Sequence, residues 1–158
     1  MNALIKENMR EALRLAKENV LTGKGGPFGA VIVHDGTIIA RAANAVVRTN
    51  DPTAHGEIVA IRQACEALGT FHLDDCELYT SCEPCPMCMG AIYWARIPRV
   101  YYAASGEDAH DAGFDDIAFY EQIALPYPEQ NLEVKQILRD EARHIFDEWN
   151  QSENKQGY

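Results

Sequence analysis

The chain has 158 residues, about the size of one domain, and 47% of them are hydrophobic against 24% charged. This composition predicts a folded core and excludes a disordered or fibrous chain. The formal net charge is -10 at pH 7, and acidic residues far outnumber basic ones over residues 105–158. Because nucleic-acid binding usually relies on a basic surface, the charge argues against DNA or RNA as a partner.

Neither a membrane span nor a secretory signal is expected. No stretch approaches the roughly 20 apolar residues that cross a bilayer, and the first 20 residues carry charges too regularly for a signal peptide. The five cysteines are an odd number, and three of them lie within residues 82–88, a spacing that suits a metal better than a disulfide framework. We therefore expect a protein of the reducing cytoplasm with no membrane partner.

The first third of the chain predicts a helix and a hairpin. Apolar residues recur at helical spacing over residues 2–21, which predicts an amphipathic helix. Two strand-like runs follow, at 28–34 and 37–42, and the Asp-Gly pair at 35–36 between them is a strong hairpin signal. These two strands are expected to be antiparallel neighbours.

The middle of the chain predicts a parallel crossover. A second helix should begin near His55 and stop at Gly69. A short strand at 77–80 runs into a segment rich in Cys and Pro, and a third helix is expected over 86–95. The apolar run 100–104 predicts a buried strand. Because a helix lies between these last two strands, they should pair in parallel.

The remainder of the chain is less regular. We expect a loop at 112–116, a short strand at 134–138 and a terminal helix over 140–150. The pattern as a whole predicts an α/β protein whose sheet carries helices on its faces.

Two short motifs carry the residues that suit a metal, Thr53-Ala54-His55-Gly56-Glu57 and Pro84-Cys85-Pro86-Met87-Cys88. One imidazole and two thiolates, from His55, Cys85 and Cys88, make three ligands for tetrahedral zinc and leave the fourth position to water. Both ligand sets begin helices, where unpaired amides and the helix dipole favour thiolate over thiol. The motifs therefore predict one catalytic Zn²⁺ per chain.

Glu57 is the expected proton carrier. It lies two positions after His55, so its side chain can turn away from the metal and stay near the water that zinc makes acidic. We expect it to be catalytic and not a ligand. His-x-Glu followed by Pro-Cys-x-x-Cys is the signature of zinc deaminases.

Other interpretations of the cysteines remain open. A closed structural zinc site would add Cys82 to the three ligands, and a Cys-x-x-Cys pair alone also suits redox chemistry. An iron–sulfur site would need a fourth cysteine followed by proline, which the region after Cys88 lacks. A structural zinc site would give Glu57 no role, and folds held by zinc are usually much smaller than this chain. Catalytic zinc is therefore favoured.

The chain resembles the cytidine deaminase superfamily, and within it the guanine deaminase branch, along nearly its whole length. The stretches that carry the resemblance are residues 25–31, 50–55, 78–88, 90–96 and 112–116, together with the terminal Tyr158. The resemblance implies a three-layer α/β/α fold with a central mixed five-stranded sheet flanked by helices. It also implies a single zinc-dependent deaminase domain over residues 1–158, in which 140–158 form a terminal helix and a tail that closes the active site.

The resemblance further implies roles for residues outside the zinc motifs. Asp116 would be catalytic, since it would reach the leaving amino group and assist proton transfer. Asn44 would hydrogen-bond a purine, and Phe28 would pack against the purine ring. Tyr158 would close the pocket, in a homodimer whose carboxy-terminal segments are exchanged.

One residue departs from the family, because Gly56 stands where alanine is usual. The missing methyl group suggests a wider pocket and a contribution of Gly56 to substrate binding. The expected activity is hydrolytic deamination of a free purine base, guanine to xanthine and ammonia, in purine metabolism. Deamination of guanosine, cytosine, a triazine or tRNA adenosine is the alternative within the same chemistry, and the acidic total disfavours tRNA.

Overall fold

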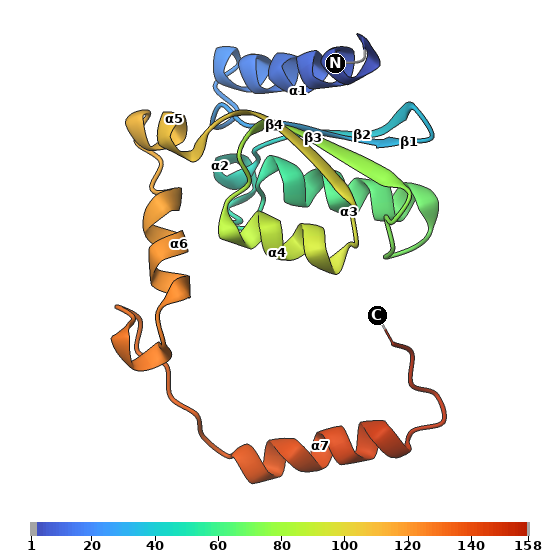
Figure 1. Ribbon diagram of the computed structural model, residues 1–158, viewed down its shortest axis with the longest axis vertical. Coiled ribbons are helices and arrows are strands. Elements are labelled where there is room, and N and C mark those ends of the chain that lie inside the picture. The colour runs from blue at the N-terminus through green and yellow to red at the C-terminus, as the bar shows by residue number, and fades with distance from the viewer. Residues whose placement is uncertain (1–2, 158) are drawn as a thin grey trace. The chain divides into compact units, whose positions relative to one another are not determined.

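The computed structural model describes residues 3–157. The chain divides into two compact units, the first ending at Tyr120 and the second beginning at Glu121. The first unit contains the sheet and every residue of the two zinc motifs (Figure 1). The single deaminase domain expected over the whole chain stays a prediction.

A four-stranded sheet in the order β2-β1-β3-β4 forms the centre of the first unit. β1 (Gly29–His34) and β2 (Thr37–Ala43) are the expected antiparallel hairpin. Residues 35–36 both have positive φ, the conformation that a tight two-residue turn requires. β1 also pairs antiparallel with β3 (Cys76–Cys82), and β3 pairs in parallel with β4 (Arg99–Ala104). The parallel pairing confirms the predicted crossover.

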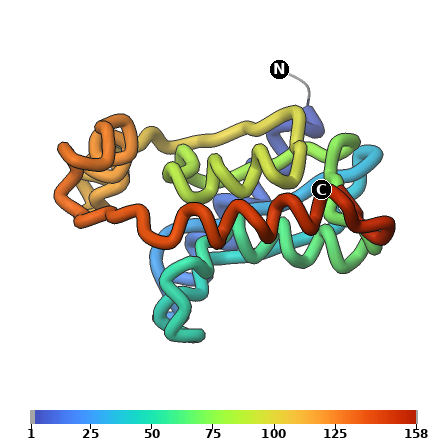
Figure 2. The backbone as a smooth tube through the Cα atoms, turned by 90° about the horizontal axis from the view of Figure 1, so that it is seen from below, coloured from blue at the N-terminus to red at the C-terminus, as the bar shows by residue number. Residues whose placement is uncertain are grey.

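Helices cover both faces of this sheet. α1 (Ala3–Leu21) lies on one face, and α3 (Gly56–Leu68) and α4 (Pro86–Trp94) lie on the other (Figure 1). Figure 2 shows α3 and α4 side by side. Successive residues of a strand face opposite sides, so Val31 packs in the cluster beneath α1, whereas Ile32 packs in the larger core beneath α3 and α4. The predicted three-layer α/β/α arrangement is confirmed.

α1 approaches the sheet closely at Gly29. A Cβ atom there would lie 2.3 Å from the main-chain oxygen of Ala12 and 2.7 Å from the main-chain nitrogen of Ala16. The absence of a side chain at Gly29 therefore allows the backbone of α1 to rest directly on β1.

Three further helices were not expected from sequence. α2 (Val46–Thr49) follows β2. α5 (Gly106–Asp111) follows β4 and begins with a capping box, in which Ser105 and Asp108 each bond the other's main-chain nitrogen. α6 (Asp116–Ala124) begins at the end of the loop predicted at 112–116 and runs across the boundary between the two units.

The second unit contains the 3-10 helix η1 (Tyr127–Glu129) and α7 (Arg139–Gln151), which confirms the predicted terminal helix. The prediction of a strand at 134–138 is wrong, and the sheet has four strands instead of the expected five. A strand needs the hydrogen bonds of a neighbour, and residues 121–157 contain no other strand. Leu138 also has a φ of 51°, outside the range of a strand.

Across residues 3–157, none of the helices is both long enough and apolar enough to span a bilayer.

Candidate metal centre and active site

The three expected metal ligands meet where α3 and α4 begin. His55 is the N-cap residue of α3, Cys85 is the N-cap residue of α4, and Cys88 lies in the first turn of α4. Neither cap residue uses its side chain to form a capping hydrogen bond with its own helix. The ligand atoms of the three residues lie within 4.8 Å of one another, and no other group of this kind occurs over residues 3–157. We call these three residues the metal triad.

The geometry of the metal triad fits zinc. The Nδ1 atom of His55 lies 3.6 Å from the Sγ atom of Cys85 and 3.6 Å from that of Cys88. Zn–N bonds of about 2.0–2.1 Å and Zn–S bonds of about 2.3 Å, at a tetrahedral angle, separate nitrogen from sulfur by about 3.6 Å. The triad can therefore hold one zinc ion and leave one coordination position open.

Cys82 does not join the metal triad. Its Sγ atom lies 3.5 Å from the main-chain oxygen of Ser105, to which the thiol donates a hydrogen bond. Burial raises the pKa of this thiol to about 11, so Cys82 stays protonated. The closed structural site of three cysteines and one histidine is therefore not supported.

The two cysteines of the triad differ in acidity. A hydrogen bond from Cys88 lowers the pKa of the Cys85 thiol, and the neighbouring imidazole of His55 lowers it further. The same contact with Cys85 raises the pKa of Cys88, as does burial. Because cysteine binds a metal as thiolate, zinc binding would release the proton that Cys88 keeps in the absence of metal.

Glu57 lies beside the metal triad without belonging to it. Its side chain is buried, with the residue only 5% exposed. One carboxylate oxygen, Oε1, accepts a hydrogen bond of 2.9 Å from the hydroxyl of Thr80, and the other, Oε2, lies 3.6 Å from the Sγ atom of Cys88. Burial raises the pKa of the Glu57 carboxyl. This is the placement expected of a proton carrier.

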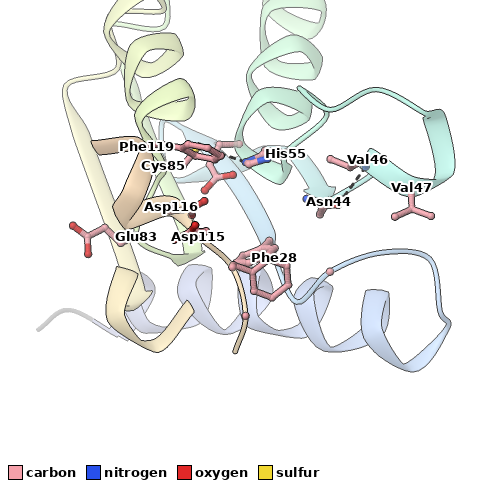
Figure 3. Close-up of a pocket in the computed structure, with 14 residues that line it drawn as sticks. Phe28, Asn44, Val46, Val47, His55, Glu83, Cys85, Asp115, Asp116 and Phe119 are labelled. Atoms are coloured by element: carbon pink, nitrogen blue, oxygen red, sulfur yellow. Dashed lines mark hydrogen bonds between the residues drawn. The ribbon is translucent and has the colours of Figure 1, made fainter. Parts of the chain in front are cut away.

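A pocket of about 350 Å³ opens over the triad (Figure 3), within the usual size range of small-molecule sites. Its walls are apolar and aromatic, with a few polar groups. The lining residues are Gly26, Phe28, Asn44, Val46, Val47, His55, Glu57, Glu83, Cys85, Gly113, Phe114, Asp115, Asp116 and Phe119.

One wall of the pocket is suited to a flat ring with polar edges. Phe28 and Phe114 form an edge-to-face pair with ring centroids 4.7 Å apart. The Oδ1 atom of Asn44 accepts a hydrogen bond of 3.2 Å from the main-chain nitrogen of Val46. This bond leaves the Nδ2 group of Asn44 to donate to a ligand.

A buried residue of α1 supports this wall from behind. The Nδ2 group of Asn19 donates hydrogen bonds of 2.9 Å to the main-chain oxygens of Gly26 and Asn44. A Cβ at Gly25 would lie 2.6 Å from that oxygen of Asn44, so the loop passes too close for any larger residue. Asn19 thus joins two segments of the pocket wall.

Asp116 reaches the site from the start of α6 and lies beside His55 and Cys85 (Figure 3). Burial raises the pKa of its carboxyl. One turn later, the hydroxyl of Tyr120 donates a hydrogen bond of 2.7 Å to the main-chain oxygen of Pro84. Because Pro84 immediately precedes Cys85, this bond ties α6, and with it Asp116, to the cysteine loop.

Two predicted site residues do not join this assembly. Gly56 is absent from the pocket lining, and a Cβ there would lie 3.5 Å from the main-chain oxygen of Phe28 and 3.6 Å from the main-chain nitrogen of Ala30. Such a methyl group would face β1 and not the cavity, so the geometry does not support a widened pocket. Tyr158 lies outside the described residues, and its role stays a prediction.

The residues of the site that sequence reasoning missed include Asn19, Thr80, Phe114 and Tyr120. Phe114 and Thr80 lie in the stretches 112–116 and 78–88 that carried the family resemblance, so a sequence signal for them existed. Nothing in the local sequence marks Asn19 or Tyr120.

Comparison with known proteins places this arrangement in a family. Residues 3–104, which include the whole metal triad, match the family model of the cytidine and deoxycytidylate deaminase zinc-binding region. The chain belongs to this deaminase family. It is a zinc-dependent hydrolase, which confirms the predicted enzyme class and metal.

The relatives of this deaminase also confirm the predicted branch. Guanine deaminase from Bacillus subtilis is 53% identical over 150 residues, which cover 95% of this chain and 96% of that protein. The X-ray structure of guanine deaminase from Bacillus subtilis gives a TM-score of 0.95 at 52% identity and covers 100% of this chain and 99% of that one. A tRNA-specific adenosine deaminase from Agrobacterium fabrum is 55% identical over 78 residues, covering 49% of this chain and 51% of that protein.

Proposed function

We propose that this deaminase hydrolyses guanine to xanthine and ammonia. The observation that carries the proposal is the extent of the similarity: identity to a guanine deaminase continues over 95% of the chain, whereas identity to the tRNA-specific adenosine deaminases covers 49–61% of it. The pocket agrees, since the rings of Phe28 and Phe114 and the amide of Asn44 suit a planar base with hydrogen-bond acceptors at its edge.

The residues of the site divide the reaction among them. A zinc ion bound by the metal triad would supply a water acidic enough to provide hydroxide near neutral pH. Glu57 would take one proton from that water and deliver it to the ring nitrogen next to the amino-bearing carbon. The water oxygen would bond to that carbon and the carbon–nitrogen bond would break, so one water and one guanine become one xanthine and one ammonia. The second proton of the water would go to the departing amino group, and Asp116 is the residue we propose to relay it.

The raised pKa values of the two carboxyl groups support these roles. Burial raises the pKa of both Glu57 and Asp116. A carboxyl group with a raised pKa holds a proton more readily than an ordinary surface carboxylate does, which suits a group that takes up and returns a proton. Phe28 and Asn44, in this proposal, hold the base against the triad while the proton moves.

The test is ammonia release by the zinc-loaded enzyme from guanine, guanosine, cytosine, adenine and a tRNA anticodon stem-loop, presented in parallel. Guanine turnover is expected, and Glu57→Gln should lower kcat by about 10²–10⁴-fold with zinc retained. Glu77→Gln, which alters a carboxylate outside the pocket, is the matched control. Turnover of another of these compounds, with no turnover of guanine, would overturn the proposed substrate. Inertness toward every compound, with zinc bound, would overturn the enzymatic role.

We also propose that the enzyme works as a cytoplasmic homodimer with exchanged carboxy-terminal segments. All five cysteines are free, as in a reducing compartment. α7 exposes the large apolar side chains of Ile145, Phe146 and Trp149, which a second copy of the chain would cover. Exchange of the carboxy-terminal segments would bring Tyr158 to the partner's pocket.

A mixing experiment tests the exchange. Sedimentation should give twice the chain mass of 17.6 kDa. If the tails are exchanged, mixing inactive Glu57→Gln with Tyr158→Ala restores turnover, because one site of the mixed dimer then has both Glu57 and Tyr158. A monomer in sedimentation refutes the dimer, and a dimer without restored turnover refutes the exchange.

A further inference from the structure

Two neighbouring residues of β3 bury a hydroxyl group, and they use it differently. Ser81 serves the main chain: its Oγ atom accepts a hydrogen bond of 3.0 Å from the nitrogen of Gly29 and lies 3.3 Å from the oxygen of Pro27. Thr80, only 1% exposed, points to the opposite face of the sheet. Its Oγ1 atom donates to the carboxylate of Glu57 at 2.9 Å.

The position of Thr80 is rigid. Thr80 pairs with Ala30 on β1 and with Tyr102 on β4, so hydrogen-bonded strands hold its backbone on both sides. β-branched side chains also have few rotamers. The hydroxyl of Thr80 is therefore a donor whose place is set by the sheet and not by the pocket loops.

The hydrogen bond from Thr80 distinguishes the two otherwise equivalent oxygens of Glu57. Oε1 accepts a hydrogen bond from the hydroxyl of Thr80, and Oε2 lies on the side of the metal triad, where it accepts one of 3.6 Å from the thiol of Cys88. Without Thr80, the buried carboxylate would lose one of its donors and could rotate toward another one.

We propose that Thr80 is a positioning residue, which anchors one oxygen of the Glu57 carboxylate so that the other faces the open side of the metal triad. Thr80 does not line the pocket, so it acts only through Glu57 and does not contact the substrate. The proposal rests on the proposed function, because it needs Glu57 to be the proton carrier. In this proposal, the orientation of the Glu57 carboxylate during proton transfer depends on Thr80, a residue of the sheet.

The variants Thr80→Val and Thr80→Ser separate the hydroxyl from the shape of the side chain. Valine keeps the shape and removes the donor, whereas serine keeps the donor. Thr80→Val should lower kcat for guanine by about 10- to 100-fold, the usual effect of losing a hydrogen bond to a charged buried group. KM should change less than about threefold, since the residues that hold the base are untouched. Thr80→Ser should recover most of kcat.

The matched control is Tyr79→Phe, which removes the hydroxyl that donates to Glu77 at 2.6 Å from the adjacent residue of β3. Tyr79 belongs to the cluster beneath α1, on the far side of the sheet from Glu57, so kcat should change less than about twofold. Two further measurements do not depend on turnover. Zinc content should stay at one ion per chain in Thr80→Val, and a crystal structure of that variant should show the Glu57 carboxylate rotated.

A double substitution gives the sharpest answer. In the Glu57→Gln background, Thr80→Val should leave the residual turnover unchanged within about twofold, since the two residues act as one unit. Multiplicative losses would show that Thr80 acts independently of Glu57 and overturn the proposal. If Thr80→Val does not fold, Thr80→Ser against Thr80→Ala repeats the comparison, and equal kcat in that pair overturns the proposal. A wild-type enzyme inert toward guanine would refute the proposed function, whereas an active wild type with an equally active Thr80→Val would refute only the role of Thr80.

Discussion

Replacing Gly56 by alanine should stabilise this deaminase and leave its catalysis unchanged. Gly56 is the first residue of α3. A Cβ there would meet its nearest atoms at 3.5 Å and 3.6 Å, on Phe28 and Ala30, which is ordinary van der Waals contact. Alanine also has less conformational freedom than glycine in the unfolded chain. The expected gain is about 0.5 kcal/mol, below the full glycine penalty because the residue lies in the first turn.

Thermal unfolding of the zinc-loaded enzyme measures this gain. For a chain of this size, about 0.5 kcal/mol raises Tm by about 1–2 °C, while kcat/KM for guanine should stay within about twofold. Gly29→Ala is the matched control. Its Cβ would lie 2.3 Å from the oxygen of Ala12, so α1 would have to shift, and the variant should lose about 3 kcal/mol or more.

Either of two results for Gly56→Ala would refute the reasoning. A fall in Tm would mean that the space between α3 and β1 is smaller than the structure shows. A change in kcat/KM of more than about threefold, with Tm raised, would mean that the residue shapes the pocket after all.

Three further predictions follow from single contacts of the site and its surroundings. Asn19→Ala should raise KM for guanine about tenfold with kcat nearly unchanged, because the main-chain oxygen of Asn44 loses a donor; steady-state kinetics with an unchanged KM would contradict this. Tyr120→Phe should lower kcat about fivefold, because the bond from its hydroxyl to Pro84 ties α6 to the cysteine loop; an unaltered kcat would show that other contacts hold α6. Hydrogen bonds from the capping box lower the pKa of the Asp108 carboxyl in the folded protein. The Asp108 carboxylate therefore stabilises the fold at a pH above its unfolded-state pKa of about 3.9. This stabilisation is lost as the pH falls through the lower folded-state pKa. The difference in unfolding free energy between wild type and Asp108→Asn should therefore shrink as the pH falls below about 4, and urea titrations that give a constant difference would refute this.

Much of the fold follows from local signals in the chain. The turn at residues 35–36 needs positive φ at both positions, and Asp-Gly adopts it readily, so the hairpin is predictable from two residues. The helix over Ala3–Leu21 repeats its apolar residues every three to four positions. The metal triad is predictable for a similar reason, since His55 and Cys85 both lie directly before a helix, and local spacing sets where those helices begin.

The strand expected at 134–138 shows where local reasoning ends. Its valine and isoleucine are common in strands, but a strand is stable only when another strand satisfies its backbone groups. Within residues 121–157 no such neighbour exists. The effect of Gly56 is equally hard to predict from sequence, because the direction of a missing methyl group depends on the strand that packs against the helix.

The amino-acid sequence by itself determined the zinc ligands and the order of the main elements, and it singled out Glu57 as the candidate proton carrier, because each depends on residues close together in the chain or on a motif with fixed spacing. Only the tertiary structure decided how those parts are supported. Thr80 reaches Glu57 across 23 positions, and Asn19 reaches Asn44 across 25. No periodicity encodes such contacts, since they arise when a strand, two helices and a loop pack together and each buried polar group must find a partner.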